Sequence, residues 1–229
     1  KYEEALREFN LALKLPIREG DLHLTFVSRG VILTELGRNR EAIKDFNKSI
    51  ELNPINPQTY IDRGIAYWNL NQYKKSLSDL DKSFELGLEE YTIKCRKYCK
   101  PDLSYVHKLR GMALFKLRRY DESMVDYTES IRLEPECNVS YLYRGRAHEK
   151  LGHLELARLD YEKGLDFFKP IPPQELVNHE LNLLWKAITG LKKMGVKREE
   201  FETYQKVIEE RKVKIQESSL RSLKTEFTF

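Results

Sequence analysis

The chain has 229 residues, of which 33% are charged and 41% are hydrophobic, and its formal net charge at pH 7 is +4. This balance is typical of amphipathic helices, and it argues against both a disordered chain and a membrane-spanning one, since no apolar run approaches bilayer length. Lysine and arginine are mixed with acids along the chain and not gathered on one stripe, so the charge gives no reason to expect nucleic-acid binding.

The cysteine content indicates a reducing compartment. Cys95, Cys99 and Cys137 are the three cysteines, too few for a disulfide-built secreted scaffold. We therefore expect an intracellular protein, in the cytoplasm. Cys95 and Cys99 lie four residues apart with His107 nearby, but zinc prefers four ligands and the sequence has no second cysteine pair. The sequence predicts no metal site and no cofactor.

Residues 1–16 match only the second helix of a unit that recurs later in the chain. Tyr2, Ala5, Phe9 and Ala12 stand where the later copies place aromatic and small residues. The first helix of this unit is absent, so we predict a truncated repeat at 1–16. We also expect the sequence to begin inside a longer protein.

Four further copies follow at residues 23–56, 57–90, 104–137 and 138–169, in the register of a 34-residue unit. Each copy has leucine at position fourteen, a small residue at twenty, a large apolar residue at twenty-four and another small residue at twenty-seven. The pattern predicts two helices in each unit, with a break at positions fifteen to seventeen.

Position eight of these copies is glycine each time, at Gly30, Gly64, Gly111 and Gly145. A glycine inside a helix costs about 1 kcal/mol relative to alanine, so its recurrence at one position favours close approach of the two helices.

Two charged positions recur as regularly. Position seven is arginine and position twenty-three is aspartate in every copy, which gives the pairs Arg29 and Asp45, Arg63 and Asp79, Arg110 and Asp126, and Arg144 and Asp160. An arginine ladder could bind acidic ligands, but the constant pairing with an acid favours a structural salt bridge between the two helices of each unit.

The regular array is interrupted twice. Residues 91–103 form a basic insertion between two copies, for which we expect a loop or a lengthened helix end. Three prolines between Pro170 and Pro173 end the strict pattern. We predict that residues 174–229 form a degenerate fifth repeat and a capping helix, with helices from near Gln174 and over about 198–216.

The unit length, the glycine, the small residues, the large apolar position and a proline at position thirty-two in two copies (Pro54, Pro135) closely resemble the tetratricopeptide repeat (TPR). The resemblance covers most of residues 1–169. It implies an all-α fold, a right-handed α-solenoid of antiparallel helix pairs that forms the TPR superhelix.

In TPR proteins the inner concave wall is formed by positions two, five, six, nine, twelve and thirteen of each first helix. These positions are unusually apolar here, so we predict that the wall binds a partner protein or peptide. The predicted partner-binding residues are Ile61, Ile65, Trp68, Tyr105, Leu109, Met112, Phe115, Leu142 and Tyr143.

One TPR class binds acidic chaperone tails through a carboxylate clamp, which uses lysine and asparagine at positions five and nine. This chain has Val27 and Val31 or Ile61 and Ile65 there, and position six holds Ser28, Asp62, Leu109 or Tyr143. The resemblance is therefore to the superfamily and not to that class.

The sequence contains no glycine-rich phosphate loop, HExxH or GxSxG motif, so we predict no enzyme but a non-enzymatic adaptor or scaffold. Two alternatives remain open. The chain could be a structural member of a multi-protein assembly whose groove is filled by its own C-terminal helix, or the regulatory segment of a larger enzyme.

Overall fold

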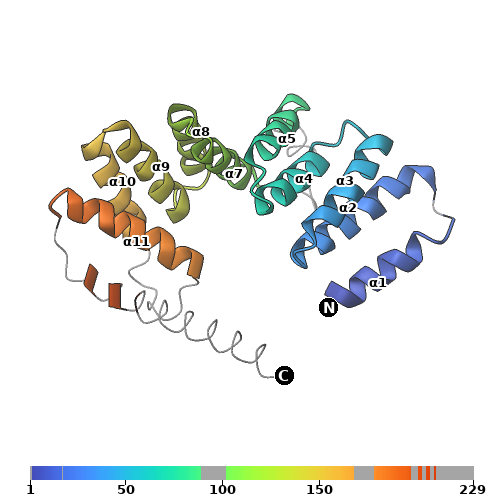
Figure 1. Cartoon of the computed structure of the whole chain (residues 1–229). Coiled ribbons are helices and arrows are strands. Elements are labelled where there is room, and N and C mark those ends of the chain that lie inside the picture. Colours follow the sequence, from blue (N-terminus) through green and yellow to red (C-terminus); the bar gives the residue numbers. More distant parts are fainter. Residues whose placement is uncertain are drawn as a thin grey trace, which may run out of the picture. The chain divides into compact units, whose positions relative to one another are not determined.

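The computed structural model describes residues 2–16, 18–88, 102–167 and 178–196, together with residues 201, 202, 205, 206 and 209. These residues form an all-α fold, with ten helices and no strand among them (Figure 1). The chain divides into two compact units, Lys1–Leu133 and Glu134–Phe229.

Unit 1 is a series of helix pairs. Its helices are α1 (Tyr2–Ala12), α2 (Glu19–Glu35), α3 (Asn39–Leu52), α4 (Pro57–Asn69), α5 (Tyr73–Glu85), α7 (Leu103–Lys116) and α8 (Tyr120–Leu133). The pairs α2 with α3, α4 with α5, and α7 with α8 pack as antiparallel hairpins, and α1 packs on α2 (Figure 1). The first helices of successive pairs also touch, because α4 contacts both α2 and α7.

Unit 2 contains α9 (Asn138–Leu151), α10 (Leu154–Asp166) and α11 (Asn178–Lys193). Helices α9 and α10 form a hairpin of the same kind, and α11 packs against both of them. The core of α11 consists of Leu183, Leu184, Ala187, Ile188 and Leu191, each at most 3% exposed.

The break that the sequence places at positions fifteen to seventeen is a left-handed turn. Its first residue has a positive φ in all five first helices that the structure describes, at Gly37 (74°), Asn71 (58°), Arg118 (62°), Gly152 (81°) and Gly195 (79°). The next N–H donates to the carbonyl five residues earlier, as from Arg38 to Leu33 at 2.8 Å, which satisfies the end of the helix. Because α11 ends in the same turn, it has the ending of a first helix of a fifth unit.

The position-eight glycines lie where the two helices of a pair cross. A Cβ atom added to Gly30, Gly111 or Gly145 would lie 2.6 to 2.9 Å from an aromatic ring at position twenty-four of the same copy. These rings belong to Phe46, Tyr127 and Tyr161, and all are fully buried. Glycine therefore lets the ring of the second helix rest directly on the backbone of the first.

Some predicted segments lie outside the described residues. These are residues 89–101 of the insertion region, residues 168–177, and most of the chain after Val196. Asp102 and Leu103, which the sequence assigned to the insertion, are the N-cap and first residue of α7. The Asp102 carboxylate accepts a hydrogen bond from the Tyr105 N–H at 3.3 Å, as expected of an N-cap aspartate.

Candidate protein-binding site

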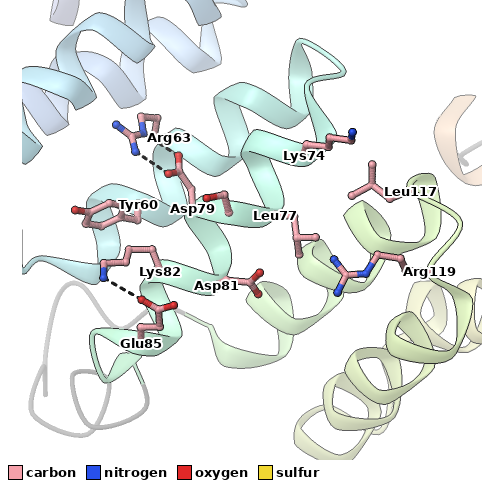
Figure 2. Close-up of a pocket in the computed structure, with 11 residues that line it drawn as sticks. Tyr60, Arg63, Lys74, Leu77, Asp79, Asp81, Lys82, Glu85, Leu117 and Arg119 are labelled. Carbon is pink, nitrogen blue, oxygen red and sulfur yellow. Dashed lines mark hydrogen bonds and ion pairs between the residues drawn. The ribbon is translucent and has the colours of Figure 1, made fainter.

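The four recurring arginines all bind the aspartate of their own helix pair. Each guanidinium donates through Nε and Nη2 to the carboxylate, as in Arg63, where Nε lies 2.8 Å from Asp79 Oδ2 and Nη2 lies 2.6 Å from Asp79 Oδ1 (Figure 2). The same two donors join Arg29 to Asp45, Arg110 to Asp126, and Arg144 to Asp160. The side chain of Asp79 is 8% exposed and that of Arg63 is 18% exposed, so most of this pair lies inside the helix packing.

Within unit 1 the third guanidinium nitrogen, Nη1, of each arginine reaches a helix that precedes its own pair. Nη1 of Arg29 lies 2.9 Å from Asn10 Oδ1, and Nη1 of Arg63 lies 2.7 Å from Asn47 Oδ1. Nη1 of Arg110 lies 3.5 Å from Asp81 Oδ1. The acceptors occupy the same repeat position, two residues after the recurring aspartate in the complete copies and two residues after Glu8 in the truncated one. One guanidinium thus joins three helices, which explains why planar arginine stands there instead of lysine.

His107 adds a second donor to one of these aspartates. Its Nδ1 lies 2.8 Å from Asp126 Oδ1, and Asp126 also receives Arg110. In the other copies the position of His107 holds an aromatic ring, which packs beside the arginine: Phe26, Tyr60 and Tyr141. These contacts make the arginine network part of the packing between helices, so the arginines do not form an open ladder for ligands.

A different surface carries the exposed apolar side chains. We call it the first-helix face: the side of α2, α4 and α7 formed by positions two, five, six, nine, twelve and thirteen. Leu24 is 51% exposed, Val31 is 37% exposed and Tyr105 is 39% exposed on this face. Ile65, Trp68 and Met112 are half-buried on it. The packing of α4 against both α2 and α7 places these side chains on neighbouring helices.

Five of the predicted partner-binding residues are buried instead, and the sequence-based assignment is corrected for them. They are Ile61 (2% exposed), Leu109 (4%), Phe115 (8%), Leu142 (0%) and Tyr143 (7%). Ile61 packs with Leu109 in the core cluster that joins α4 to α7. Leu142 lies against Gly164 of α10. Four of these five residues occupy position five or six, and Phe115 occupies position twelve. The same positions five and six stay partly exposed in other copies, at Val27, Ser28 and Asp62, so burial there depends on the copy.

Asp62 is a polar residue of the first-helix face that the partner-binding prediction did not include. It is partly buried, and its Oδ1 accepts a hydrogen bond from Gln58 Nε2 at 2.9 Å. Burial raises the pKa of Asp62 to about 6. Partial burial also raises the pKa of Tyr105, and the negative charges of Asp62 and Glu35 raise it further. In the sequence, the acid at position six of this copy was the signal that could have identified Asp62 as a candidate binding residue.

The second-helix side of unit 1 contains an open depression of about 810 Å³ (Figure 2). It is lined mainly by α4 and α5, with Leu117 and Arg119 from the turn after α7. Its charges are largely paired, since Arg63 binds Asp79, Lys82 binds Glu85 and Arg119 binds Glu122. The depression therefore offers no converging set of free polar groups for one class of ligand.

In the part of the chain that the structure describes, no group of three or more histidine, cysteine, aspartate or glutamate side chains is placed to hold a metal ion. Cys95 and Cys99 lie outside that part. None of the described helices combines the length and the apolar character needed to cross a bilayer.

Two family models match the chain. Residues 30–78 match a family described as a TPR repeat, and residues 108–170 match one described as a tetratricopeptide repeat. The chain is a tetratricopeptide repeat protein. Its fold is accordingly an all-α TPR solenoid, as the sequence predicted. No curated protein matches the sequence.

Solved TPR structures resemble the chain throughout most of its length. MamA from Desulfovibrio magneticus RS-1 is 18% identical with a TM-score of 0.62, over 74% of this chain and 87% of that one. YrrB, described as a TPR protein with an unusual peptide-binding site, is 14% identical with a TM-score of 0.61, over 88% and 91%. A chain of the APC/C hetero-tetramer Cut9–Hcn1 is 16% identical with a TM-score of 0.63, over 81% and 33%. At these identities the likeness establishes the fold and not a shared partner.

Proposed function

We propose that this TPR protein is a non-enzymatic adaptor that binds a segment of a partner protein on the first-helix face of unit 1. The observation that carries the proposal is the exposure of Leu24, Val31 and Tyr105 on helices that flank α4. Contiguous apolar area on a helix surface is seldom left in water unless another molecule covers it. TPR arrays are generally protein-interaction modules, and this chain carries such an array.

The spacing of these side chains favours an elongated ligand. Leu24 and Val31 are seven residues apart on α2, about 10 Å along a helix. Tyr105 lies on α7, on the other side of α4. A ligand that touches all three must therefore lie across three helices. A helix or an extended segment of a partner protein has these dimensions, and it would deliver several apolar side chains at once.

The experiment compares two matched pairs of leucine or valine substitutions. Leu24→Ser with Val31→Ser alters the first-helix face, whereas Leu156→Ser with Leu159→Ser alters two leucines of α10 that are 50% and 61% exposed. We expect only the first variant to reduce capture of the partner proteins, by about tenfold, and both to keep their melting temperature. Phe115→Ala is unsuitable as a test of binding, because Phe115 is buried and its loss would leave a cavity.

A second candidate function is supported by α10. Leu154, Leu156 and Leu159 are all at least 50% exposed on it, and Leu156 and Leu159, three residues apart, share one side of the helix. Such a surface favours a structural member of a larger assembly, which makes its contacts through the outer helices. Loss of partners from the Leu156→Ser and Leu159→Ser variant, with the α2 variant unchanged, would support this function against the adaptor. The self-filled groove of the sequence-based alternative involves a C-terminal helix that lies outside the described residues.

A further inference from the structure

Asp62 differs from the other carboxylates that this chain places in its helix packing. Asp45, Asp79, Asp126 and Asp160 are each at most 6% exposed, and each is bound by the two-donor fork of an arginine. Among the described residues, the one hydrogen-bond partner of Asp62 is the neutral amide of Gln58, and no lysine or arginine forms an ion pair with it. Asp62 is therefore a partly buried acid without a counter-cation.

The surroundings of Asp62 do not replace the missing cation. Burial is the main cause of its raised pKa, opposed only by the Gln58 hydrogen bond. Asp62 and Glu35 together act on the hydroxyl of Tyr105 as negative charges. Lys108 is a cation on the same helix as Tyr105, but its Nζ lies over the Tyr105 ring, 5.1 Å from the centroid. A carboxylate held in this way costs free energy that a cation of a ligand would recover.

The residues around Asp62 indicate what accompanies that cation. Ile65 and Trp68 follow Asp62 on α4, and both pack against the core cluster that joins α4 to α7 while remaining partly exposed. Leu24 and Val31 project from α2 and Tyr105 from α7. A ligand that places a cation at Asp62 therefore meets apolar side chains on both sides.

We propose that Asp62 determines the specificity of the first-helix face by binding a lysine or arginine side chain of the partner segment, flanked by aliphatic residues. This inference rests on the proposed function above, since it names the chemistry of the ligand of the same face. Gln58 fixes Oδ1 of the carboxylate and leaves Oδ2 for the incoming cation. The cation then gives Asp62 a positively charged hydrogen-bond donor, as the guanidinium of the next residue, Arg63, does for Asp79.

Three fluorescein-labelled peptides of identical length test the proposal. Each has leucines on both sides of a central residue, which is lysine, methionine or glutamate, and binding to the full chain is followed by fluorescence anisotropy. We expect the lysine peptide to bind about tenfold more tightly than the methionine peptide, and the glutamate peptide to bind most weakly. Asp62→Asn should abolish the preference for lysine over methionine, and Asp62→Lys should transfer it to glutamate. Asp121→Asn is the matched control, because it removes one negative charge from the exposed first turn of α8.

A second readout separates ion pairing from a structural role of Asp62. The carboxyl carbon of Asp62, followed by NMR, should titrate near pH 6 in the free chain and at a lower pH in the presence of the lysine peptide. The Asp62→Asn variant should melt no lower than the wild-type chain, since it removes an uncompensated charge. An unchanged titration in a chain saturated with the lysine peptide would overturn direct contact.

The two proposals fail in different ways. Equal affinity for the lysine and methionine peptides, with both weakened by Leu24→Ser and Val31→Ser, would overturn the role of Asp62 and leave the binding face standing. Peptide binding that neither the α2 variant nor Asp62→Asn alters would overturn both. A lysine peptide that does not bind at all would also reject the inference about Asp62, while the capture experiment would still decide the function.

Discussion

Alanine at two equivalent glycines should have opposite effects on the stability of unit 1. At Gly111 a new Cβ would lie 2.9 Å from Tyr127 Cε1 and 3.2 Å from Asp126 Cβ. Tyr127 is fully buried, and Asp126 is held by both Arg110 and His107, so neither can move away cheaply. Overpacking of this kind costs about 1 to 3 kcal/mol. The better helix propensity of alanine offsets about 1 kcal/mol of this cost, so we expect Gly111→Ala to destabilise unit 1 by up to about 2 kcal/mol.

At Gly64 the same substitution meets ordinary contact distances. The nearest atom to its Cβ would be Leu80 Cγ at 3.4 Å, because this copy has leucine where the others have an aromatic ring. Only the gain in helix propensity remains, so Gly64→Ala should stabilise by about 1 kcal/mol.

Urea unfolding at 25 °C, followed by circular dichroism at 222 nm, measures both variants against the wild-type chain. Both glycines lie in helices of unit 1, α4 and α7, so the same transition reports both. We expect the two midpoints to separate by about 1 M urea, with the wild type between them. Shifts of the same sign and size would refute the explanation of position eight by ring packing. Gly111→Leu should lower the free energy of unfolding more than Gly111→Ala does.

Three further predictions concern charge and backbone. Asp79→Ala should destabilise the chain by about 3 kcal/mol in a urea titration, because it leaves the largely buried Arg63 without its carboxylate, whereas Glu51→Ala in the exposed Lys48 pair should leave the midpoint unchanged. The pKa of Asp62 is raised from 3.8 to about 6 in the folded state, so the folded state binds the proton more tightly than the unfolded state does. The contribution of Asp62 to stability therefore falls as the pH rises from 4 to 6. We expect urea titrations at pH 4 and pH 7 to show a loss of about 2 kcal/mol that is absent in Asp62→Asn. Arg118→Gly should raise the urea midpoint by relieving a left-handed arginine, a gain of about 1 kcal/mol, and a midpoint that falls would contradict this account.

The repeat architecture could be predicted from the sequence because the residues that define it act locally and recur in register. The aspartate sixteen residues after each arginine has one geometric role, which every copy repeats. The glycine at position eight meets an aromatic ring in three of the four copies. The Arg63 to Asp79 contact follows from that spacing, since two helices joined by a short turn bring the two positions together. The left-handed turn was harder to predict from the sequence, because its positive-φ residue is not glycine in two of the five turns, at Asn71 and Arg118.

The binding face could not be predicted residue by residue, because burial depends on how one helix pair lies against the next. Ile61 and Ile65 look equivalent in the sequence, yet Ile61 packs against α7 and Ile65 stays partly exposed. The contacts of Arg63 with Asn47, and of Arg29 with Asn10, join neighbouring pairs and are likewise set by that stacking.

The sequence by itself thus determined the helix pairs, their crossing points and the charged pairs within them, all of which depend on residues inside one unit. Only the tertiary structure decided which apolar side chains remain in solvent. It also decided that Asp62, unlike Asp79, is paired with no lysine or arginine among the residues that the structure describes. The reason is physical: a hydrophobic or charged residue has no fixed free energy of its own, and its contribution depends on the neighbours that packing brings to it.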